Sequence, residues 1–205
     1  GELAARFNVS QGTVRKAIDE MAAENLLIRR QGKGTFVASH DDPLSFYRFL
    51  RLVPDDGNAA QAVSVPLSCS TKNADAEVAA ALGLKVGDQV IYVERLLRFN
   101  GATVVFDQIH LVSDLFAGLT LESLSGGDRS LYSLFENDYG VRMIHAEEHL
   151  RAVAADPYRA GLLAVPSGSP LLLVERTAYT YGNKPVEWRR GLYCTNRHYY
   201  RNDLG

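Results

Sequence analysis

The sequence predicts an α+β protein with a small N-terminal domain of helices and one hairpin, followed by a larger domain built on an antiparallel sheet. Two short amphipathic segments and a glycine-rich hairpin lie within the first 38 residues. A polar segment containing a proline follows at 39–44, and a helix–strand–strand pattern then occurs twice, 81 positions apart. We therefore expect one domain at 1–38, a linker at 39–44 and a second domain at 45–205.

Composition narrows the class of protein. The chain has 205 residues, of which 46% are hydrophobic and 22% charged, and its length suits two domains. No apolar run approaches the roughly 20 residues that span a bilayer, and there is no secretory signal pattern, so we expect a cytoplasmic protein without membrane partners. Cys69 and Cys194 share no short motif, which favours isolated thiols over a disulfide framework or a zinc site.

The N-terminal segment reads as two helices joined by a tight turn. Residues 2–7 place Leu3 and Phe7 on one helical face, and Ser10 stands at the expected N-cap of the next helix. That helix has one apolar stripe that we expect to be buried, formed by Val14, Ala17, Ile18 and Met21. The spacing predicts a helix-turn-helix, whose second helix presents polar and basic residues at its N-terminal end.

A strand–turn–strand pattern follows the helices. Leu26 to Ile28 and Thr35 to Val37 are apolar, and the segment 32–34 between them reads Gly-Lys-Gly. Basic residues flank the tip, as a wing that contacts phosphates requires, although a solvated basic hairpin has the same pattern. A nucleotide-binding loop is excluded, because the Gly-x4-Gly-Lys-Ser/Thr spacing is absent. The first 40 residues carry six basic and four acidic side chains, against sixteen and twenty in the remainder.

Residues 1–38 resemble the winged helix-turn-helix domain of GntR-family repressors, on the segments Glu2–Ile18 and Leu26–Val37. The resemblance implies double-stranded operator DNA as a partner and a further helix before Gly1. It also implies a set of DNA-contacting residues: Gln11, Thr13, Arg15, Gly32 and Lys33. Most members carry Arg where this chain has Gln11. Because Gln pairs best with adenine and Arg with guanine, we expect an altered operator preference.

The second domain contains an internal repeat. Val93-Glu94-Arg95 recurs as Val174-Glu175-Arg176. Each copy is preceded by a helical stretch, alanine-rich in the first copy, and followed by a hairpin turn, at Asn100-Gly101 and Gly182-Asn183. Two copies predict two pseudo-symmetric halves of one antiparallel sheet with helices on a face. Between them we expect a helix near 130–139 and a strand near 142–153.

Two polar patterns in this domain admit more than one interpretation. The Glu-Arg dipeptides suggest an active site, but alternation along a strand puts Glu94 and Arg95 on opposite faces, so surface ion pairs are the alternative. His145, Glu147 and His149 share one face of a strand and could hold a metal, although a third clear ligand is missing. No catalytic cluster or cofactor fingerprint is present, so no catalytic residues, cofactor or resident metal is expected.

Residues 45 to about 203 resemble the UTRA effector-binding domain of the HutC-type branch of GntR regulators. The resemblance is carried by the segments near 95, at 130–132, 139–142, 168–177 and 185–187. It implies a fold like that of chorismate lyase, used to sense small molecules. Members that sense sugar phosphates hold the anion with two arginines spaced two apart and with a Ser-x-Tyr pair. In this chain the matching residues are Arg95, Ser130 and Tyr132, and Leu97 stands where the second arginine would be.

Three further polar positions match the family's effector-binding residues: Asp107, Glu187 and Tyr193. An arginine offers a bidentate fork to an anion, and Ser130 at a helix start would add backbone N–H groups. Because Leu97 removes one guanidinium, we expect a carboxylate or a less charged ligand instead of a doubly charged phosphate. The alternative for Tyr132 and Tyr193 is a core aromatic with a hydrated hydroxyl.

The sequence therefore predicts a homodimeric transcription regulator, a repressor, whose affinity for a palindromic operator is controlled by a small-molecule effector, anionic or carboxylate-bearing. Two other functions stay open: a chorismate-lyase-like enzyme with an incidental DNA-binding head, and a metal-responsive regulator that uses His145 and His149.

Overall fold

The structure is a computed structural model that describes residues 1–23, 26–39, 50–57, 62–126 and 129–202. Of the predicted linker at 39–44, only Ser39 belongs to these ranges. The predicted start of the second domain near Leu44 lies outside them.

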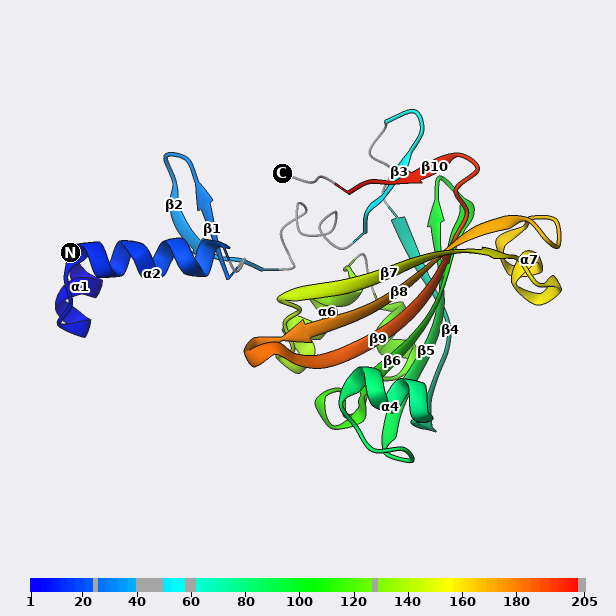
Figure 1. Cartoon of the computed structure of the whole chain (residues 1–205), viewed down its shortest axis with the longest axis horizontal. Coiled ribbons are helices and arrows are strands. Elements are labelled where there is room, and N and C mark those ends of the chain that lie inside the picture. The colour runs from blue at the N-terminus through cyan, green and yellow to red at the C-terminus, as the bar shows by residue number, and fades with distance from the viewer. Residues whose placement is uncertain (24–25, 40–49, 58–61, 127–128, 203–205) are drawn as a thin grey trace.

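The N-terminal domain has the two helices and the hairpin that the sequence predicts (Figure 1). Helix α1 spans Glu2–Phe7 and ends at Asn8, whose φ of 51° is left-handed. Helix α2 spans Gln11–Ala23, and the hydroxyl of Ser10 caps it by accepting a hydrogen bond from the backbone N–H of Thr13 at 3.0 Å. The hairpin consists of β1 (Leu27–Arg30) and β2 (Gly34–Val37).

The apolar stripe of α2 is less buried than predicted. Val14 and Ile18 are half-buried, whereas Ala17 and Met21 are exposed, and Met21 retains 38% of its accessible surface. The reason is that, among the described residues, only α1 and the hairpin pack extensively against α2. These small elements cover one side of the stripe and leave the rest in solvent.

The second domain is built on a six-stranded antiparallel sheet with strand order β4-β5-β6-β9-β8-β7. The strands are β4 (Ala62–Asn73), β5 (Gln89–Phe99), β6 (Ala102–Val112), β7 (His145–Ala154), β8 (Pro170–Thr180) and β9 (Lys184–Tyr193). A separate two-stranded pair joins β3 (Leu52–Pro54) to β10 (His198–Tyr200). The fold class predicted from the sequence, an N-terminal helix-turn-helix with a hairpin followed by an antiparallel-sheet domain, is confirmed.

The internal repeat is a structural repeat. In the first half, α4 (Ala76–Leu82) leads into β5 and β6, and in the second half α7 (Pro157–Leu163) leads into β8 and β9. Asp75 and Asp156 cap the two helices in the same way, each accepting a backbone N–H at 2.9 Å. The strand order is symmetric: β4, β5 and β6 of the first half correspond to β7, β8 and β9 of the second, and β6 pairs with β9 at the centre. The two halves are therefore related by an approximate twofold axis between these strands.

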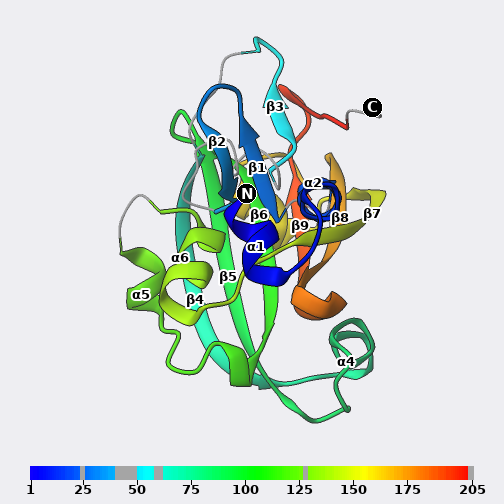
Figure 2. The ribbon, with the colours of Figure 1, turned by 90° about the vertical axis from the view of Figure 1, so that its left-hand side faces the viewer.

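Helix α6 (Leu131–Tyr139) and strand β7 separate the two halves, as predicted. The strand begins at His145, three residues later than the sequence suggested. Gly140 ends α6 in the left-handed region at φ 66°, and Val141 and Met143 then bury their side chains in the core beneath the helix. A short helix, α5 (Leu121–Ser125), precedes α6, and both lie on one side of the sheet while α4 lies on the other (Figure 2).

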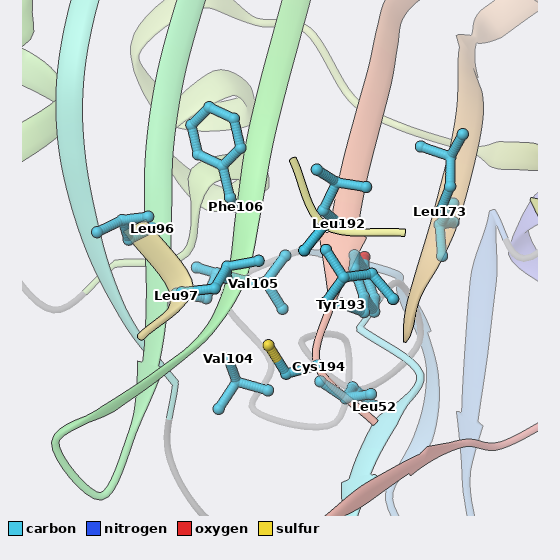
Figure 3. Close-up of a cluster of buried hydrophobic side chains, with 14 of the residues drawn as sticks. Leu52, Leu96, Leu97, Val104, Val105, Phe106, Leu173, Leu192, Tyr193 and Cys194 are labelled. Carbon is cyan, nitrogen blue, oxygen red and sulfur yellow. The ribbon is translucent and has the colours of Figure 1, made fainter. Parts of the chain in front are cut away.

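Three hydrophobic clusters hold the sheet domain together. One packs α6 against the centre of the sheet, and a second packs α4 against β5, β6 and β9 around Trp188. The third lies at the end of the sheet nearest α7 and includes Leu97, Val105 and Tyr193 (Figure 3). Polar side chains that share a face with these clusters are consequently withdrawn from water.

Candidate functional site

The first turn of α2 presents the residues that sequence reasoning assigned to base and phosphate contacts. Gln11, Thr13 and Arg15 are all exposed. The hydroxyl of Thr13 lies 2.9 Å from that of Ser10, so it is held at the helix start next to the capping residue. An exposed polar first turn on a helix that follows a tight turn is the arrangement used to enter the major groove.

The hairpin places the other two predicted DNA contacts at its tip. Gly32 adopts φ 72°, a left-handed conformation that glycine takes without steric cost, and both Gly32 and Lys33 are exposed. An ion pair between Arg29 of β1 and Asp19 of α2 ties the hairpin to the second helix. This contact is one of the links between the hairpin and α2.

In the sheet domain, Arg95 and Asp107 form a buried ion pair across β5 and β6. Arg95 donates from Nε to Oδ2 of Asp107 at 2.9 Å, and its Nη2 lies 2.9 Å from the same oxygen. Arg95 is 7% exposed and Asp107 is fully buried. Burial lowers the pKa of Arg95, and the neighbouring Arg189 lowers it further, whereas Asp107 opposes the change. Asp107 therefore offsets part of the cost of burying the guanidinium of Arg95.

A second guanidinium joins this pair from β9. Arg189, which is 5% exposed, donates from Nη1 to Oδ2 of Asp107 at 3.3 Å and from Nη2 to Oε2 of Glu187 at 3.0 Å. Burial opposes its charge, but Glu187 and Asp107 raise the pKa of Arg189 well above its ordinary value. Two arginines and two carboxylates thus form one buried cluster with no net charge: Arg95, Asp107, Glu187 and Arg189.

The two predicted tyrosines flank this charge cluster. The hydroxyl of Tyr132, on α6, donates to Oε1 of Glu187 at 2.9 Å, and the guanidinium carbon of Arg189 lies 5.6 Å from the centre of its ring. Burial raises the pKa of Tyr132 to about 12, with a further contribution from Glu187. Burial, followed by Asp107, likewise raises the pKa of Tyr193 to about 12. Both hydroxyls are therefore protonated at neutral pH.

Gly191 makes room for this arrangement. A Cβ atom at this position would lie 2.4 Å from Cε1 of Tyr193 and 2.8 Å from Oδ1 of Asp107. That oxygen is buried and has no hydrogen-bond partner within the described part of the chain. The centre of the cluster thus combines a close approach of β6 and β9 with an unused acceptor.

Ser130 stands at the start of α6, the helix that carries Tyr132. It caps α6, its hydroxyl accepting a hydrogen bond from the backbone N–H of Ser133 at 3.1 Å, as its predicted position at a helix start requires. It lies two residues before Tyr132 and is half-buried. The structure therefore pairs Arg95 with Asp107 and Tyr132 with Glu187, and Arg189 connects the two pairs. Tyr193 lies close to Asp107 at Gly191, and Ser130 stays at the helix start.

Sequence reasoning missed Arg189 and a neighbouring buried pair. Arg176 of β8, 3% exposed, donates from Nε to Oε1 of Glu148 on β7 at 2.6 Å. The period of two along a strand could have found Arg189, because Glu187, Arg189, Gly191 and Tyr193 all share one face. Leu97 belongs to the hydrophobic cluster of Figure 3, and the second guanidinium comes from β9 in place of β5.

The two glutamates of the repeated dipeptides lie on the other face of the sheet, as strand alternation predicts. Glu94 accepts a hydrogen bond from the hydroxyl of Tyr92 at 2.6 Å. Glu175 pairs with Arg151 and with Arg190, the latter at 3.4 Å. The interpretation as surface ion pairs is correct for Glu175, whereas the arginines of both dipeptides are buried.

His145 and Glu147 of β7 have partners other than a metal ion. His145 stacks on Tyr179 with ring centres 4.6 Å apart, and its Nε2 lies 2.5 Å from Oδ1 of Asn183. Glu147 accepts a hydrogen bond from the hydroxyl of Tyr179 at 3.1 Å. Within the described ranges, no three His, Cys, Asp or Glu side chains are placed to hold a metal ion together.

Comparison with known proteins assigns each of the two domains to a family. Residues 1–37 match the family model described as bacterial regulatory proteins of the gntR family, and residues 61–199 match the UTRA domain. The chain is a GntR-family transcriptional regulator with a UTRA ligand-binding domain. In the described ranges, this regulator has no helix long and apolar enough to cross a membrane.

The relatives of the regulator are named for control of transcription. It is 31% identical to the probable transcriptional regulator PhnF of Escherichia coli, over 91% of this chain and 77% of that protein. It is 28% identical to the HTH-type transcriptional repressor PhnF of Mycolicibacterium smegmatis, over 96% and 79% of the two chains. A structure described as the ligand-binding domain of a GntR-family regulator from Bordetella bronchiseptica is 48% identical, with a TM-score of 0.75, over 78% of this chain and 99% of that chain.

Proposed function

We propose that the regulator is a homodimeric repressor that binds a palindromic operator through α2 and the hairpin, and that a small-molecule effector controls this binding from the buried charge cluster. The observation that carries the proposal is the set of paired charges, with Asp107 presenting an unused oxygen beside Gly191. DNA contacts are assigned to Gln11, Thr13 and Arg15 together with the hairpin tip.

The balance of charge in the cluster supports an effector of low net charge. Arg95 and Arg189 are each matched by a carboxylate, so a doubly charged anion would add two uncompensated charges to a buried site. A carboxylate of the effector can form an ion pair with the guanidinium of Arg95, while a hydroxyl or amine on the same molecule donates a hydrogen bond to Oδ1 of Asp107. We therefore assign to the site a ligand that carries one carboxylate and at least one such donor.

Helix α6 supports a route from the site to the N-terminal domain. It carries Tyr132, which donates to Glu187, and one turn later Glu136, whose Oε2 accepts a hydrogen bond from the hydroxyl of Ser39 at 3.3 Å. Ser39 lies just beyond the hairpin. An effector that displaces the hydroxyl of Tyr132 would shift α6 and change this contact, which would alter the population of head orientations.

A thermal-shift screen of small carboxylates and sugar derivatives tests the effector site. Compounds that stabilise the parent protein should lose most of their effect in Arg95→Ala. The matched control is Arg98→Ala, three residues along the same strand, because Arg98 is exposed. If a stabilising compound protects Arg95→Ala as well as it protects the parent, the site is assigned incorrectly.

Binding to a panel of operator half-sites tests the DNA assignment. Gln11→Arg should move the preferred base from adenine toward guanine at one position of each half-site, by about 1–3 kcal/mol of discrimination. Lys33→Ala should weaken binding to every half-site by a similar factor, because a phosphate contact carries no sequence information. An unchanged base preference in Gln11→Arg contradicts the assignment of α2.

A further inference from the structure

Strands β3 and β10 form a two-stranded ribbon at one end of the sheet (Figure 1). Leu52 of β3 pairs with Tyr200 of β10, so their side chains share one face of the ribbon, and His198 lies on the same face two residues away. That face points toward the sheet, because Leu52 is buried and the ring of His198 packs on Phe99 of β5 with centres 5.5 Å apart. Tyr199, on the opposite face of the ribbon, is 44% exposed.

The ribbon covers the face of the sheet that carries the charge cluster. Phe99 lies on the same face of β5 as Arg95, four residues away. Leu52 packs in the hydrophobic cluster that contains Tyr193 (Figure 3), and the ring of Tyr193 lies close to Asp107. The ribbon therefore borders the place where Asp107 presents its unused oxygen.

A polar contact ties the ribbon to the charge cluster. The hydroxyl of Tyr200 donates a hydrogen bond to Oε2 of Glu148, and Oε1 of Glu148 accepts one from Nε of Arg176 at 2.6 Å. Arg176 is the cross-strand partner of Arg189. Burial raises the pKa of Tyr132, and a hydrogen bond from Arg176 partly opposes this change. Contacts therefore run from Tyr200 through Glu148 and Arg176 to the cluster.

Helix α6 covers the cluster from another side, and the two covering elements differ in how firmly they are held. The helix has nine residues, and four consecutive side chains from Tyr132 to Phe135 are buried. The ribbon has three residues in each strand, and among these six only Leu52 is buried. Elements with few buried apolar contacts open at the lowest free energy. Of these two elements, the ribbon is thus the one that can open while the sheet stays folded.

We propose that the β3–β10 ribbon is the lid of the effector site, and that the hydrogen bond from Tyr200 to Glu148 is the latch that keeps it closed. An effector reaches Oδ1 of Asp107 when this bond breaks and the ribbon lifts, and it is enclosed when the bond forms again. Within the described ranges, β3 is the first strand after the predicted linker, so a lid that opens also moves the chain leading from the N-terminal domain. This inference rests on the effector site of the proposed function and names what controls access to it.

Carbodiimide footprinting of the full chain, read by peptide mass spectrometry, tests the lid through the buried carboxylate. Tyr200→Phe removes the hydroxyl and keeps the ring, so the modification rate of Asp107 should rise at least about tenfold, because a hydrogen bond to a charged acceptor is lost. Tyr199→Phe is the matched control, since it removes a hydroxyl from the exposed face of the same strand and should leave Asp107 protected. Glu77, whose side chain is 58% exposed, is the internal reference and should react equally in every variant.

The two cysteines report separately on the ribbon and on the rest of the sheet domain. Cys194 is buried in the same hydrophobic cluster as Leu52, whereas Sγ of Cys69 on β4 lies 3.6 Å from the backbone oxygen of Leu119. Labelling with a maleimide should be at least about tenfold faster at Cys194 in Tyr200→Phe and unchanged at Cys69. Faster labelling of both thiols would mean that the whole domain has loosened, which contradicts a lid.

A second variant loosens the ribbon without touching the latch. Leu52→Ala removes the buried side chain of β3, so it should also raise the modification rate of Asp107, and it decides the question if Tyr200→Phe does not fold. If Asp107 becomes reactive in Leu52→Ala alone, the lid stands and Tyr200 is rejected as its latch.

The outcomes separate the lid from the proposed function. If Asp107 reacts at the rate of the parent in both variants, the lid is wrong, and a thermal shift that depends on Arg95 would still support the effector site. If the reactivity of Asp107 follows the ribbon but no carboxylate gives a shift that depends on Arg95, the proposed effector is wrong, and the ribbon controls access to a charge cluster with another role.

Discussion

The two halves of the sheet domain have the same backbone and different chemistry. Both consist of a capped helix and two strands, and both place an arginine on the buried face, Arg95 in the first half and Arg176 in the second. The cross-strand partner of Arg95 is Asp107, whereas the cross-strand partner of Arg176 is Arg189. Equivalent positions near the twofold axis therefore carry opposite charges.

Because the equivalent positions carry unlike charges, the two halves can form one charge-paired cluster between them. Were both halves to carry Asp at these positions, two carboxylates would meet at the axis, and were both to carry Arg, four guanidiniums would meet there. With one of each, Arg189 reaches across to Asp107 at 3.3 Å, and the outer arginines are matched by Asp107 and Glu148. The substitutions below test how far the cluster depends on this asymmetry.

The largest effect is expected from removing Arg189, the arginine that reaches from the second half to Asp107. Arg189→Leu leaves Asp107 and Glu187 buried without their shared partner, which costs about 3–5 kcal/mol of stability. Urea unfolding followed by the fluorescence of Trp188, the single tryptophan of the chain, measures it. Arg190→Leu is the matched control on the opposite face, where the side chain is 39% exposed, and should cost less than about 1 kcal/mol. Equal losses in the two variants would mean that the cluster is not coupled through Arg189.

The next largest loss of stability is expected from filling the space beside Gly191, where β9 lies close to Asp107 of β6. Gly191→Ala forces its Cβ atom against the ring of Tyr193 and against Asp107, so we expect a loss of about 1–3 kcal/mol. Gly161→Ala, inside α7 with nothing within 4 Å, should be neutral or stabilising by up to about 1 kcal/mol. The same unfolding measurement distinguishes them. A tolerated alanine at 191 would show that Tyr193 and Asp107 can separate without cost.

A third effect is confined to acid pH and to the first half. His110 packs between Tyr92 and Trp188, and burial lowers its pKa to about 4 from an ordinary value near 6.5. Because the unfolded chain binds the proton more readily, His110 destabilises the fold as the pH falls from about 6.5 to 4. His110→Gln should reduce the loss of melting temperature between pH 7 and pH 5. An unchanged loss would assign the acid sensitivity to other groups.

The smallest effect is expected on the open face of the second half. Glu175→Gln removes ion pairs with Arg151, which is 61% exposed, and with Arg190. Glu175 is 11% exposed but both arginines reach solvent, so the pairs should contribute about 1 kcal/mol, and 1 M salt should reduce the difference from the parent. A loss larger than that of Gly191→Ala would show that the two faces of the sheet are not energetically distinct.

Much of the architecture could be predicted because it rests on local signals. The N-caps at Ser10, Asp75 and Asp156 and the hairpin turn at Asn100-Gly101 are determined by residues a few positions apart. The repeated Val-Glu-Arg segment made it possible to predict that the sheet consists of two similar halves. The resemblance to the UTRA domain supplied Asp107, Glu187 and Tyr132, which the structure joins through Arg95 and Arg189.

The remainder depended on pairings between distant strands. Strand alternation puts Arg189 on the same face as Glu187, but only the register of β9 with β6 and β8 brings it within reach of Asp107 and next to Arg176. The stripe of α2 was predicted to be buried from its helical spacing, but burial also needs a covering element, and spacing carries no information about one. Strand β4 was not predicted, since its polar face and Pro66 weaken the strand pattern.

The twofold relation between the halves has a consequence for the orientation of a bound molecule. A strictly symmetric site would accept an elongated ligand in two orientations of equal energy, and the ligand would exchange between them. The buried Asp107 on one side of the axis and Arg189 on the other make these orientations unequal, because reversal would bring like charges together. The proposed effector would thus always point the same end toward α6, the helix in contact with Ser39.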